Sequence, residues 1–357
     1  MEGREARPDD TDGGMTSSVG TFSIVAMDAD SPEWGIAVAS RVPDVGYAVA
    51  WVQAGVGAVA SQAQLNPYLG AWALQELAAG AEAPQALDTV LAKDPTPELR
   101  QVGLVDRQGR TAAHTGKSTL EWAGHRTAPG VSVQGNILAG PRVLDHMLDA
   151  FGAARGPLGE RLLAALEAGE QAGGDRRGRQ SAALFVRRAR GGYQGVDDRL
   201  IELKVTDHQD PIPELRRLYE IWQYAYLAPA YLRLSDEEKE RGDFFLGRVH
   251  GLLCKALQHP LSEASAYNNL AWELALRKRF PDETLQAAEM AHRLSPEDAG
   301  VLDTLAEAHY AAGNPAQAVY WETEALQRAP DNAFLQQQLD KFTRALQETS
   351  ASPAASD

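Results

Sequence analysis

The pattern of apolar residues changes near residue 206, and this change most limits what the chain can fold into. Before it, short apolar runs rich in β-branched residues alternate with segments of helical periodicity. Phe22–Met27 and Val131–Ile137 are typical of strands, and Leu158–Glu170 is typical of a helix. After the linker-like segment Asp207–Pro211, only helical periodicity continues. The sequence therefore predicts an α/β or α+β domain followed by an all-α domain.

The composition narrows the class of partner. The 357 residues are 44% hydrophobic, which is enough to form two cores, and the net charge of −15 argues against nucleic acid or an anionic membrane surface as the main partner. No apolar run approaches the roughly 18 residues of a membrane helix. Residues 1–20 are polar and lack the apolar centre of a signal peptide. We therefore expect a disordered leader over residues 1–20 and a cytoplasmic protein.

Motifs for metals and cofactors are missing from the sequence. Cys254 is the single cysteine, so neither an internal disulfide nor a cysteine-rich metal site is possible. The sequence has no HExxH motif, no paired Cys or His spacing and no glycine-rich phosphate loop. We expect no metal and no cofactor.

Thr21 stands directly behind Gly20 and in front of an apolar run. If the chain were cut between these two residues, the freed α-amine of Thr21, with a pKa of about 8, would accept the proton of the Thr21 hydroxyl, so one residue would supply both nucleophile and base. On this segment alone, Thr21 is also explained as merely the first residue of a strand, where Thr is common. The bond could be cut by the chain itself or by another protease, or it could stay intact in a binding module.

Several segments occur together in one order: Ala39-Ser40-Arg41, Gly57–Ala63, Trp122–His125, Val133–Gly140 and Gly173–Leu184. With Thr21–Ala26 they resemble the domain of unknown function 1028 family from about residue 21 to about residue 220. That family is assigned by fold resemblance to the N-terminal nucleophile (Ntn) hydrolases. The resemblance implies an α+β fold, a four-layer α/β/β/α sandwich over residues 21–206, and leaves the substrate open.

An N-terminal nucleophile needs groups that tune its amine and donors for an oxyanion. For tuning, Asp28 and Arg41 would return beside Thr21 through a hairpin; alternatively, Asp28 caps a turn and Arg41 is a solvated surface charge. For the oxyanion, Asn136 is the candidate, because Gly135 lets the backbone approach closely and the amide nitrogen donates. Asn136 would otherwise fix the turn before the next helix.

The glycine- and arginine-rich segment 173–181 lies in front of a buried strand and suits a carboxylate or amide group of a substrate. On the resemblance, Asp175 and Ser181 would contact the amine, and Arg179 and Gln180 the substrate; the alternative is an internal ion-pair loop. The remaining candidates for substrate binding are Ser40, within the motif given above, and His114. A hydrogen-bonded structural histidine is the alternative role for His114.

The helical part contains an internal repeat. Residues 207–262 are expected to form a linker and helices over 211–226 and 237–258, the latter capped by Ser235. Leu270 recurs as Leu305 (305 − 270 = 35) and Pro296 as Pro330 (330 − 296 = 34), the period of tetratricopeptide (TPR) repeats. We expect TPR-like repeats over 263–348 and a disordered tail over 349–357.

These observations lead to two hypotheses on function. The first is an amidohydrolase that cuts an amide bond of a small-molecule or peptide substrate, with Thr21 as nucleophile, and binds a protein or peptide through the TPR region. The second is a non-catalytic adaptor in which the α/β domain binds a ligand. The TPR region would otherwise pack on the hydrolase domain or form a homodimer.

Overall fold

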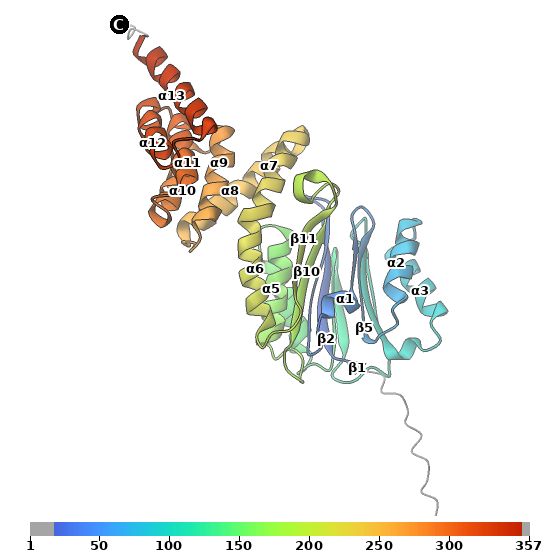
Figure 1. Cartoon of the computed structure of the whole chain (residues 1–357). Helices are drawn as coiled ribbons and strands as arrows, with labels where there is room; N and C mark the ends of the chain where they lie inside the picture. Colours follow the sequence, from blue (N-terminus) through green and yellow to red (C-terminus); the bar gives the residue numbers. More distant parts are fainter. Residues whose placement is uncertain (1–17, 352–357) are drawn as a thin grey trace, which may run out of the picture.

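The computed structural model describes residues 18–351 and contains two antiparallel sheets that face each other (Figure 1). The five-stranded sheet has the order β1-β5-β6-β7, with β4 also paired to β5. Its strands are β1 (Ser18–Val19), β4 (Ala50–Gln53), β5 (Gly57–Gln64), β6 (Arg100–Asp106) and β7 (Thr111–Thr115). The six-stranded sheet has the order β11-β10-β3-β2-β9-β8. Its strands are β2 (Thr21–Asp28), β3 (Glu33–Ser40), β8 (Gly124–Ala128), β9 (Val131–Asn136), β10 (Ser181–Arg187) and β11 (Arg199–Val205).

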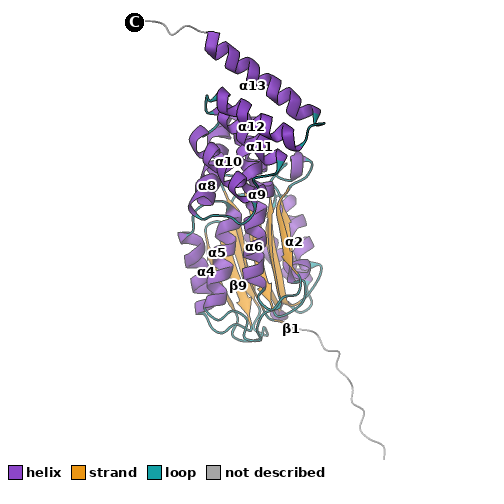
Figure 2. Ribbon diagram, turned by 60° about the vertical axis from the view of Figure 1, so that its left-hand side comes forward, coloured by secondary structure: helices purple, strands orange, loops and turns teal. Residues whose placement is uncertain are grey.

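Helices cover the outer faces of both sheets (Figures 1 and 2). The helices α2 (Leu69–Ala78) and α3 (Ala83–Lys93) lie on the five-stranded sheet. The helices α4 (Arg142–Ala153), α5 (Leu158–Gln171) and α6 (Pro211–Trp222) lie on the six-stranded sheet. The short α1 (Val45–Val49) packs at the edge between the sheets. Layered helices and antiparallel sheets confirm the predicted mixed α/β domain.

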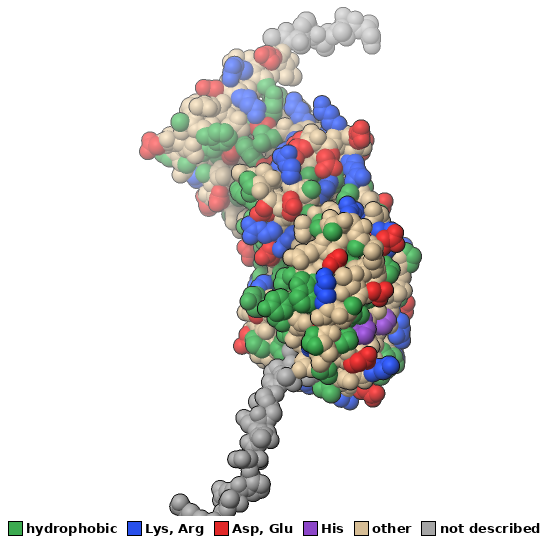
Figure 3. Space-filling model, turned by 90° about the vertical axis from the view of Figure 1, so that its right-hand side faces the viewer, with side chains coloured by type: hydrophobic (Ala, Val, Ile, Leu, Met, Phe, Trp, Pro, Cys, Tyr) green, Lys and Arg blue, Asp and Glu red, His purple; other side chains and the backbone are tan. Residues whose placement is uncertain are grey.

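The face that carries α2 and α3 mixes acidic, basic and hydrophobic side chains (Figure 3). Aromatic residues contribute to this surface: Tyr68 is 61% exposed and stacks on Trp72, with ring centroids 5.4 Å apart. The negative net charge is therefore not gathered into one patch on this side of the molecule.

The part of the chain after β11 is helical throughout the described residues. A π-helical turn (Gln223–Leu227) joins α6 to α7 (Ala228–Glu237). The helices that follow are α8 (Gly242–Gln258), α9 (Ala264–Leu276), α10 (Pro281–Leu294), α11 (Ala299–Ala311), α12 (Pro315–Arg328) and α13 (Ala333–Ala351). None of the described helices is long and apolar enough to cross a membrane.

The helix spacing reproduces the repeat seen in the sequence. From α9 to α11 the start advances by 299 − 264 = 35 residues, and from α10 to α12 by 315 − 281 = 34. Small residues at the helix contacts, among them Ala271, Ala288 and Ala306, are completely buried, which lets neighbouring helices approach closely. The helical region therefore resembles TPR repeats, as expected.

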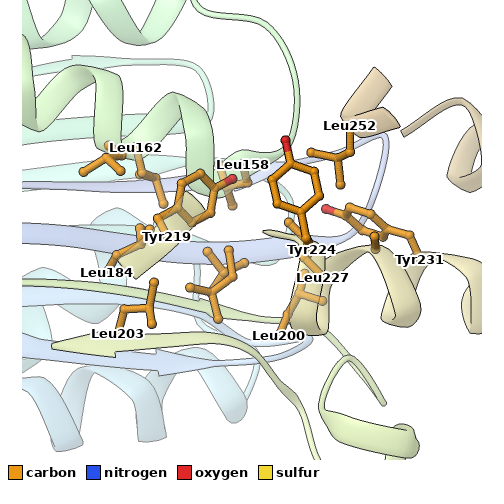
Figure 4. Close-up of a cluster of buried hydrophobic side chains, with 14 of the residues drawn as sticks. Leu158, Leu162, Leu184, Leu200, Leu203, Tyr219, Tyr224, Leu227, Tyr231 and Leu252 are labelled. Carbon is orange, nitrogen blue, oxygen red and sulfur yellow. The ribbon is translucent and has the colours of Figure 1, made fainter. Parts of the chain in front are cut away.

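One hydrophobic core joins the six-stranded sheet to the helical region. Residues of β10, β11, α5, α6, α7 and α8 meet in it (Figure 4). Tyr219, Leu227 and Tyr231 are at most 1% exposed, and Leu184 packs into the same cluster from the sheet. Ion pairs support this contact, because Arg216 of α6 binds Glu160 and Glu167 of α5 at 2.7 and 2.8 Å. Residues 211–222 thus form a helix, as expected, and this helix packs on the six-stranded sheet.

The structure corrects the predicted start of the helix over 237–258. Ser235 and Glu237 belong to the end of α7, a 3-10 turn spans Lys239–Arg241, and α8 begins only at Gly242. The Ser235 hydroxyl donates to the Leu232 carbonyl at 2.6 Å, so it binds the helix behind it and does not cap the next one.

Residues 1–17 of the predicted leader and 352–357 of the predicted tail lie outside the described residues. Ser18–Val19 were expected to be disordered and instead form β1, because Gln64 and Ala63 pair with them on the edge of β5. Residues 349–351, also expected to be disordered, belong to α13.

Candidate active site

Four polar side chains line up across one end of the six-stranded sheet. Ser181 pairs with Ser40, Ser40 with Thr21, and Thr21 with Asn136, on the adjacent strands β10, β3, β2 and β9. Residues paired directly across antiparallel strands point to the same face. We call these four residues the polar row. None of them is more than 2% exposed, and they face the other sheet, because Phe22, the next residue along β2, packs into the core beneath the helices.

The peptide bond in front of Thr21 lies where the chain crosses from β1 in one sheet to β2 in the other. The carbonyl oxygen of Gly20 accepts a hydrogen bond from Arg177 Nη2 at 2.8 Å and a second one from Ser40 Oγ. Thr21 Oγ1 lies 3.2 Å from Ser40 Oγ. Since Ser40 donates its single hydrogen to Gly20, Thr21 is the donor in that contact. The carbonyl and the hydroxyl on either side of one peptide bond thus share Ser40.

Asp175 holds Arg177 in place. Its Oδ2 lies 2.7 Å from Arg177 Nη2 and its Oδ1 lies 3.1 Å from Arg177 Nε, a two-pronged contact that fixes the plane of the guanidinium. Asp175 also accepts from the backbone N–H groups of Arg177 and Arg41, at 2.9 and 3.2 Å. The side chain of Asp175 is 1% exposed. A buried acid with four donors therefore orients the arginine that reaches the Gly20 carbonyl.

The end of β9 explains how the loop that carries Asp175 and Arg177 reaches Gly20. Ile137 has a φ of 54°, a left-handed conformation that is strained for a β-branched residue. The turn lets the Ile137 carbonyl accept from Arg176 N at 2.9 Å, and Leu138 forms an isolated bridge with Asp175. These contacts lay the loop after α5 against the end of the sheet, beside the start of β2.

A buried network of amide side chains lies between the sheets, next to the polar row. Ser23 Oγ donates to Gln62 Oε1 at 2.7 Å and accepts from Gln134 Nε2 at 2.7 Å. Gln62 Nε2 and Asn136 Nδ2 both donate to Gln101 Oε1, at 2.8 and 3.0 Å. None of the five is more than 1% exposed. Asn136 Oδ1 is buried without a hydrogen-bond partner among the described residues.

This network binds the amide nitrogen that Asn136 was expected to offer to an oxyanion. Its amide nitrogen donates to Gln101, and the donors to the Gly20 carbonyl are Ser40 and Arg177. The unsatisfied acceptor of Asn136 lies at the register position opposite Thr21. Asn136 thus lies opposite Thr21 in the register, with its amide nitrogen bound to Gln101 and its amide oxygen without a partner among the described residues.

Ser181 of the polar row and two further candidates beside the row, Arg41 and Gln180, hold its surroundings in place. Ser181 Oγ donates to the Val42 carbonyl at 2.5 Å and accepts from Val45 N at 3.1 Å, so it anchors the segment after β3. Arg41 Nη1 donates to Gln180 Oε1 at 2.8 Å. Gln180 in turn donates to Asp207 at 3.1 Å. No contact of these three with the Gly20 carbonyl is present.

Asp28 is not brought to Thr21. The two residues begin and end the same eight-residue strand, and Asp28 pairs with Glu33 at the opposite end of the sheet from the polar row. The expectation that the hairpin returns Asp28 beside Thr21 is therefore wrong, because the turn follows Asp28 directly. The carboxylate instead binds Arg248 of α8 at 3.1 Å.

His114 and Arg179 also lie away from the Gly20 carbonyl. His114 is on β7 in the other sheet, and its Nε2 contacts the Pro97 carbonyl at 3.0 Å. Arg179 makes ion pairs with Asp210, at 3.0 Å, and with Glu170. Both residues therefore have structural partners. These contacts correspond to the alternative roles given above, a hydrogen-bonded structural histidine and an internal ion-pair loop.

The sequence did not single out Arg177, Gln62 or Gln101. Arg177 is one of three arginines in the segment 173–181, and the composition of the segment gives no reason to choose one of them over the others. The available signal was Asp175 two residues earlier, a spacing that suits a local ion pair. The two glutamines lie inside apolar strands, where a buried amide signals a polar network.

Among residues 18–351, no group of three or more His, Cys, Asp or Glu side chains lies close enough together to hold a metal ion.

Solved structures resemble both parts of the chain. The crystal structure of protein SPO2555 from Silicibacter pomeroyi, a DUF1028 protein, matches with a TM-score of 0.54 and 31% identity, over 59% of this chain and 92% of that one. The first TPR domain of human RPAP3 matches with a TM-score of 0.27 and 17% identity, over 34% of this chain and 97% of that domain. The Sgt2 TPR domain of Aspergillus fumigatus matches with a TM-score of 0.27 and 15% identity, over 36% of this chain and 87% of that domain.

No curated protein matches the chain. The sequence profile described as "Family of unknown function (DUF1028)" matches residues 21–215, which begin at the first residue of β2 and include the whole polar row. The chain belongs to the DUF1028 family.

Proposed function

We propose that this protein is a self-processing amidohydrolase of the N-terminal nucleophile type, with the four-layer α/β/β/α fold of that superfamily. Thr21 is the nucleophile once the bond between Gly20 and Thr21 is cut. The observation that supports this most strongly is the contact set of that bond: two donors on the Gly20 carbonyl, one of which also accepts from the Thr21 hydroxyl. These are the groups that an attack of the hydroxyl on the carbonyl requires.

The cleavage proceeds in two steps. Thr21 Oγ1 attacks the carbonyl carbon of Gly20; its proton passes to Ser40 Oγ, while Ser40 gives its own proton to the carbonyl oxygen. Arg177 stabilises the negative charge that develops on this oxygen. Collapse of the adduct re-forms the carbonyl and breaks the C–N bond; the proton of the adduct hydroxyl passes to the nitrogen of Thr21, and Gly20 is left as an ester on Thr21. Water then hydrolyses the ester, which releases Gly20 as an acid and Thr21 with a free amine and a free hydroxyl.

The same groups would serve the mature enzyme. The freed amine takes the proton from the hydroxyl when Thr21 attacks an amide substrate. Ser40 and Arg177 then hold the substrate carbonyl, and Asp175 is the positioning residue for Arg177. Asn136 Oδ1, buried and without a partner among the described residues, would accept a hydrogen bond from the amine, which supports its role beside the nucleophile.

The test is the intact mass of the purified full chain together with its N-terminal sequence. We expect the wild type to begin at Thr21, the Thr21→Ser variant to be processed more slowly, and the Thr21→Ala variant to keep residues 1–20. Thr127→Ala, an exposed threonine of β8, is the matched control and should process like the wild type.

Two outcomes would contradict the proposal. Processing of Thr21→Ala at the wild-type rate would mean that another protease makes the cut. A wild type that keeps its leader, and hydrolyses no amide, would favour the adaptor hypothesis, in which the layered domain only binds a ligand.

A cavity supports a separate proposal for the helical region, the binding of a peptide. It measures about 550 Å³ and lies between α6 and the start of α9, lined among others by Ile221, Tyr224, Leu261 and Asn269. Ile221 is 47% exposed although its side chain is apolar. Peptides selected from a random library on the full chain should lose binding to an Ile221→Asp variant. Equal binding to both proteins would refute this site. The homodimer and the cytoplasmic location stay predictions.

A further inference from the structure

β1 occupies a position on the sheet edge that a separate chain could take. β5 pairs on this edge with β4, up to the pair Ala60 and Ala50, and then with β1, through Ala63 with Val19 and Gln64 with Ser18. Figure 1 shows β1 at the end of the sheets where β2 begins. Release of residues 1–20 would leave the backbone groups at this end of β5 unpaired, and an open edge of this kind accepts an extended peptide.

The leader passes from this edge directly into the polar row. Val19 is paired to β5, and the very next residue, Gly20, presents its carbonyl to Ser40 and Arg177. The pairing with β5 thus fixes the place of the carbonyl relative to the hydroxyl of Thr21. A substrate that adopts the same pairing would bring its own carbonyl to the same two donors.

The space around Gly20 admits no side chain. A Cβ atom added there would lie 2.8 Å from Arg177 Nη2 and 2.9 Å from Ile137 Cβ, closer than real Cβ contacts. Neither neighbour yields easily, because Arg177 is held by Asp175 through two contacts and Ile137 sits in a constrained left-handed turn. A larger residue would therefore push Arg177 away from the carbonyl that it must hold.

We propose that the substrate of the mature enzyme is an extended peptide, or a peptide-like amide, with glycine on the acyl side of the scissile bond, which pairs with β5 in the place of β1. The inference rests on the proposed function, because it uses the same nucleophile and the same donors. The leader is then both the first substrate of the site and a template for later ones. Thr21 attacks the glycine carbonyl, the amine product leaves with the proton, and water releases the glycine acid.

The first experiment measures leader release in four full-length proteins: wild type, Gly20→Ala, Arg177→Ala and the double variant. We expect Gly20→Ala to slow release by about 100-fold, the usual effect of losing one donor to an oxyanion. When Arg177 is already replaced by alanine, the side chain at position 20 has room. Gly20→Ala should then slow leader release by less than about 10-fold. Gly140→Ala is the matched control, since a Cβ there meets nothing within 4 Å, and should be processed like the wild type.

The second experiment supplies substrates to the mature wild type. Fluorogenic amides ending in Ser-Val-Gly and in Ser-Val-Ala are compared with the amide of acetyl-glycine, which lacks the residues that pair with β5. We expect kcat/KM to be about 100-fold higher with glycine than with alanine, and the short amide to have a raised KM.

The outcomes separate this inference from the proposal on which it rests. A wild type that keeps its leader would overturn both. If the leader is released but Gly20→Ala is processed as fast as the wild type, or alanine amides are hydrolysed as well as glycine amides, the substrate class is wrong and the nucleophile stands. Hydrolysis only of non-peptide amides by the mature enzyme would also overturn the inference alone.

Discussion

Glu33 leads to a prediction on how the free energy of unfolding depends on pH, and the magnitude of this dependence follows from the structure. It begins β3, is 1% exposed, and accepts on Oε1 from Ser31 Oγ at 2.5 Å and from the Tyr231 hydroxyl at 3.3 Å. Its Oε2 has no partner among the described residues. Burial is the main cause that raises the pKa of Glu33 from 4.5 to about 7; Asp28 adds to the rise, and Ser31 and Arg248 oppose it.

The sign and the magnitude follow from the proton that the folded state retains. A shift of 7 − 4.5 = 2.5 units corresponds to roughly 3 kcal/mol at 1.36 kcal/mol per unit. Below the unfolded pKa this contribution to the free energy of unfolding is fully present. It is lost as the pH rises from about 5 through 7, because the unfolded chain ionises Glu33 while the folded chain keeps it neutral.

The assay is urea unfolding of the wild type and of Glu33→Gln at pH 5, 6, 7 and 8. The glutamine of the variant does not titrate, so the free energy of unfolding of the variant minus that of the wild type should grow by roughly 2.5 kcal/mol from pH 5 to pH 8. Glu289→Gln, at an exposed position of α10, is the control and should show no such trend. A difference between Glu33→Gln and the wild type that is the same at all four values would refute the reasoning.

Three more predictions concern other parts of the molecule. Ser40→Ala should slow release of residues 1–20 by about 100-fold, read by intact mass, since it removes one donor to the Gly20 carbonyl; release at the wild-type rate would contradict this. Glu322→Gln should raise the free energy of unfolding at pH 8, measured in urea, because burial, and then the neighbouring Asp303, hold the pKa of Glu322 well above its usual range; a loss of stability would argue against it. Arg216→Ala should lower the melting temperature and the free energy of unfolding, the latter by about 3 kcal/mol, because Glu160, in a largely buried place, would keep only the more distant Lys255 as a cationic partner among the described residues; an unchanged melting temperature would count against this reasoning.

Strands with a continuous apolar run could be predicted from the sequence, and those defined by their neighbours could not. β2, β6 and β10 are almost completely buried, so both their faces are apolar enough to be recognised. β4 and β8 are short and half-buried, and β8 carries a glycine, a histidine and an arginine. Their extended conformation comes from pairing with β5 and β9, which a single sequence does not display.

The residues of the candidate site divide in the same way: those at strand ends could be proposed from the sequence, and those placed by tertiary contacts could not. Thr21, Ser40 and Asn136 could be proposed because each lies at the end of a recognisable strand, and register then brings them into one row. Arg177 could not be chosen among its neighbouring arginines, because its role depends on the crossing of the chain at Gly20 and on the bend at Ile137. Both are tertiary features that local composition does not encode.

The two donors on the Gly20 carbonyl also determine when, during folding, the bond between Gly20 and Thr21 can be cut. They come from positions 20 and 157 residues further along the chain. Contacts of such long sequence separation form late in folding, after the loops between them have closed. During synthesis the bond would therefore stay intact until β10 has emerged and joined β3, and every molecule that has lost its leader would have assembled these strands first.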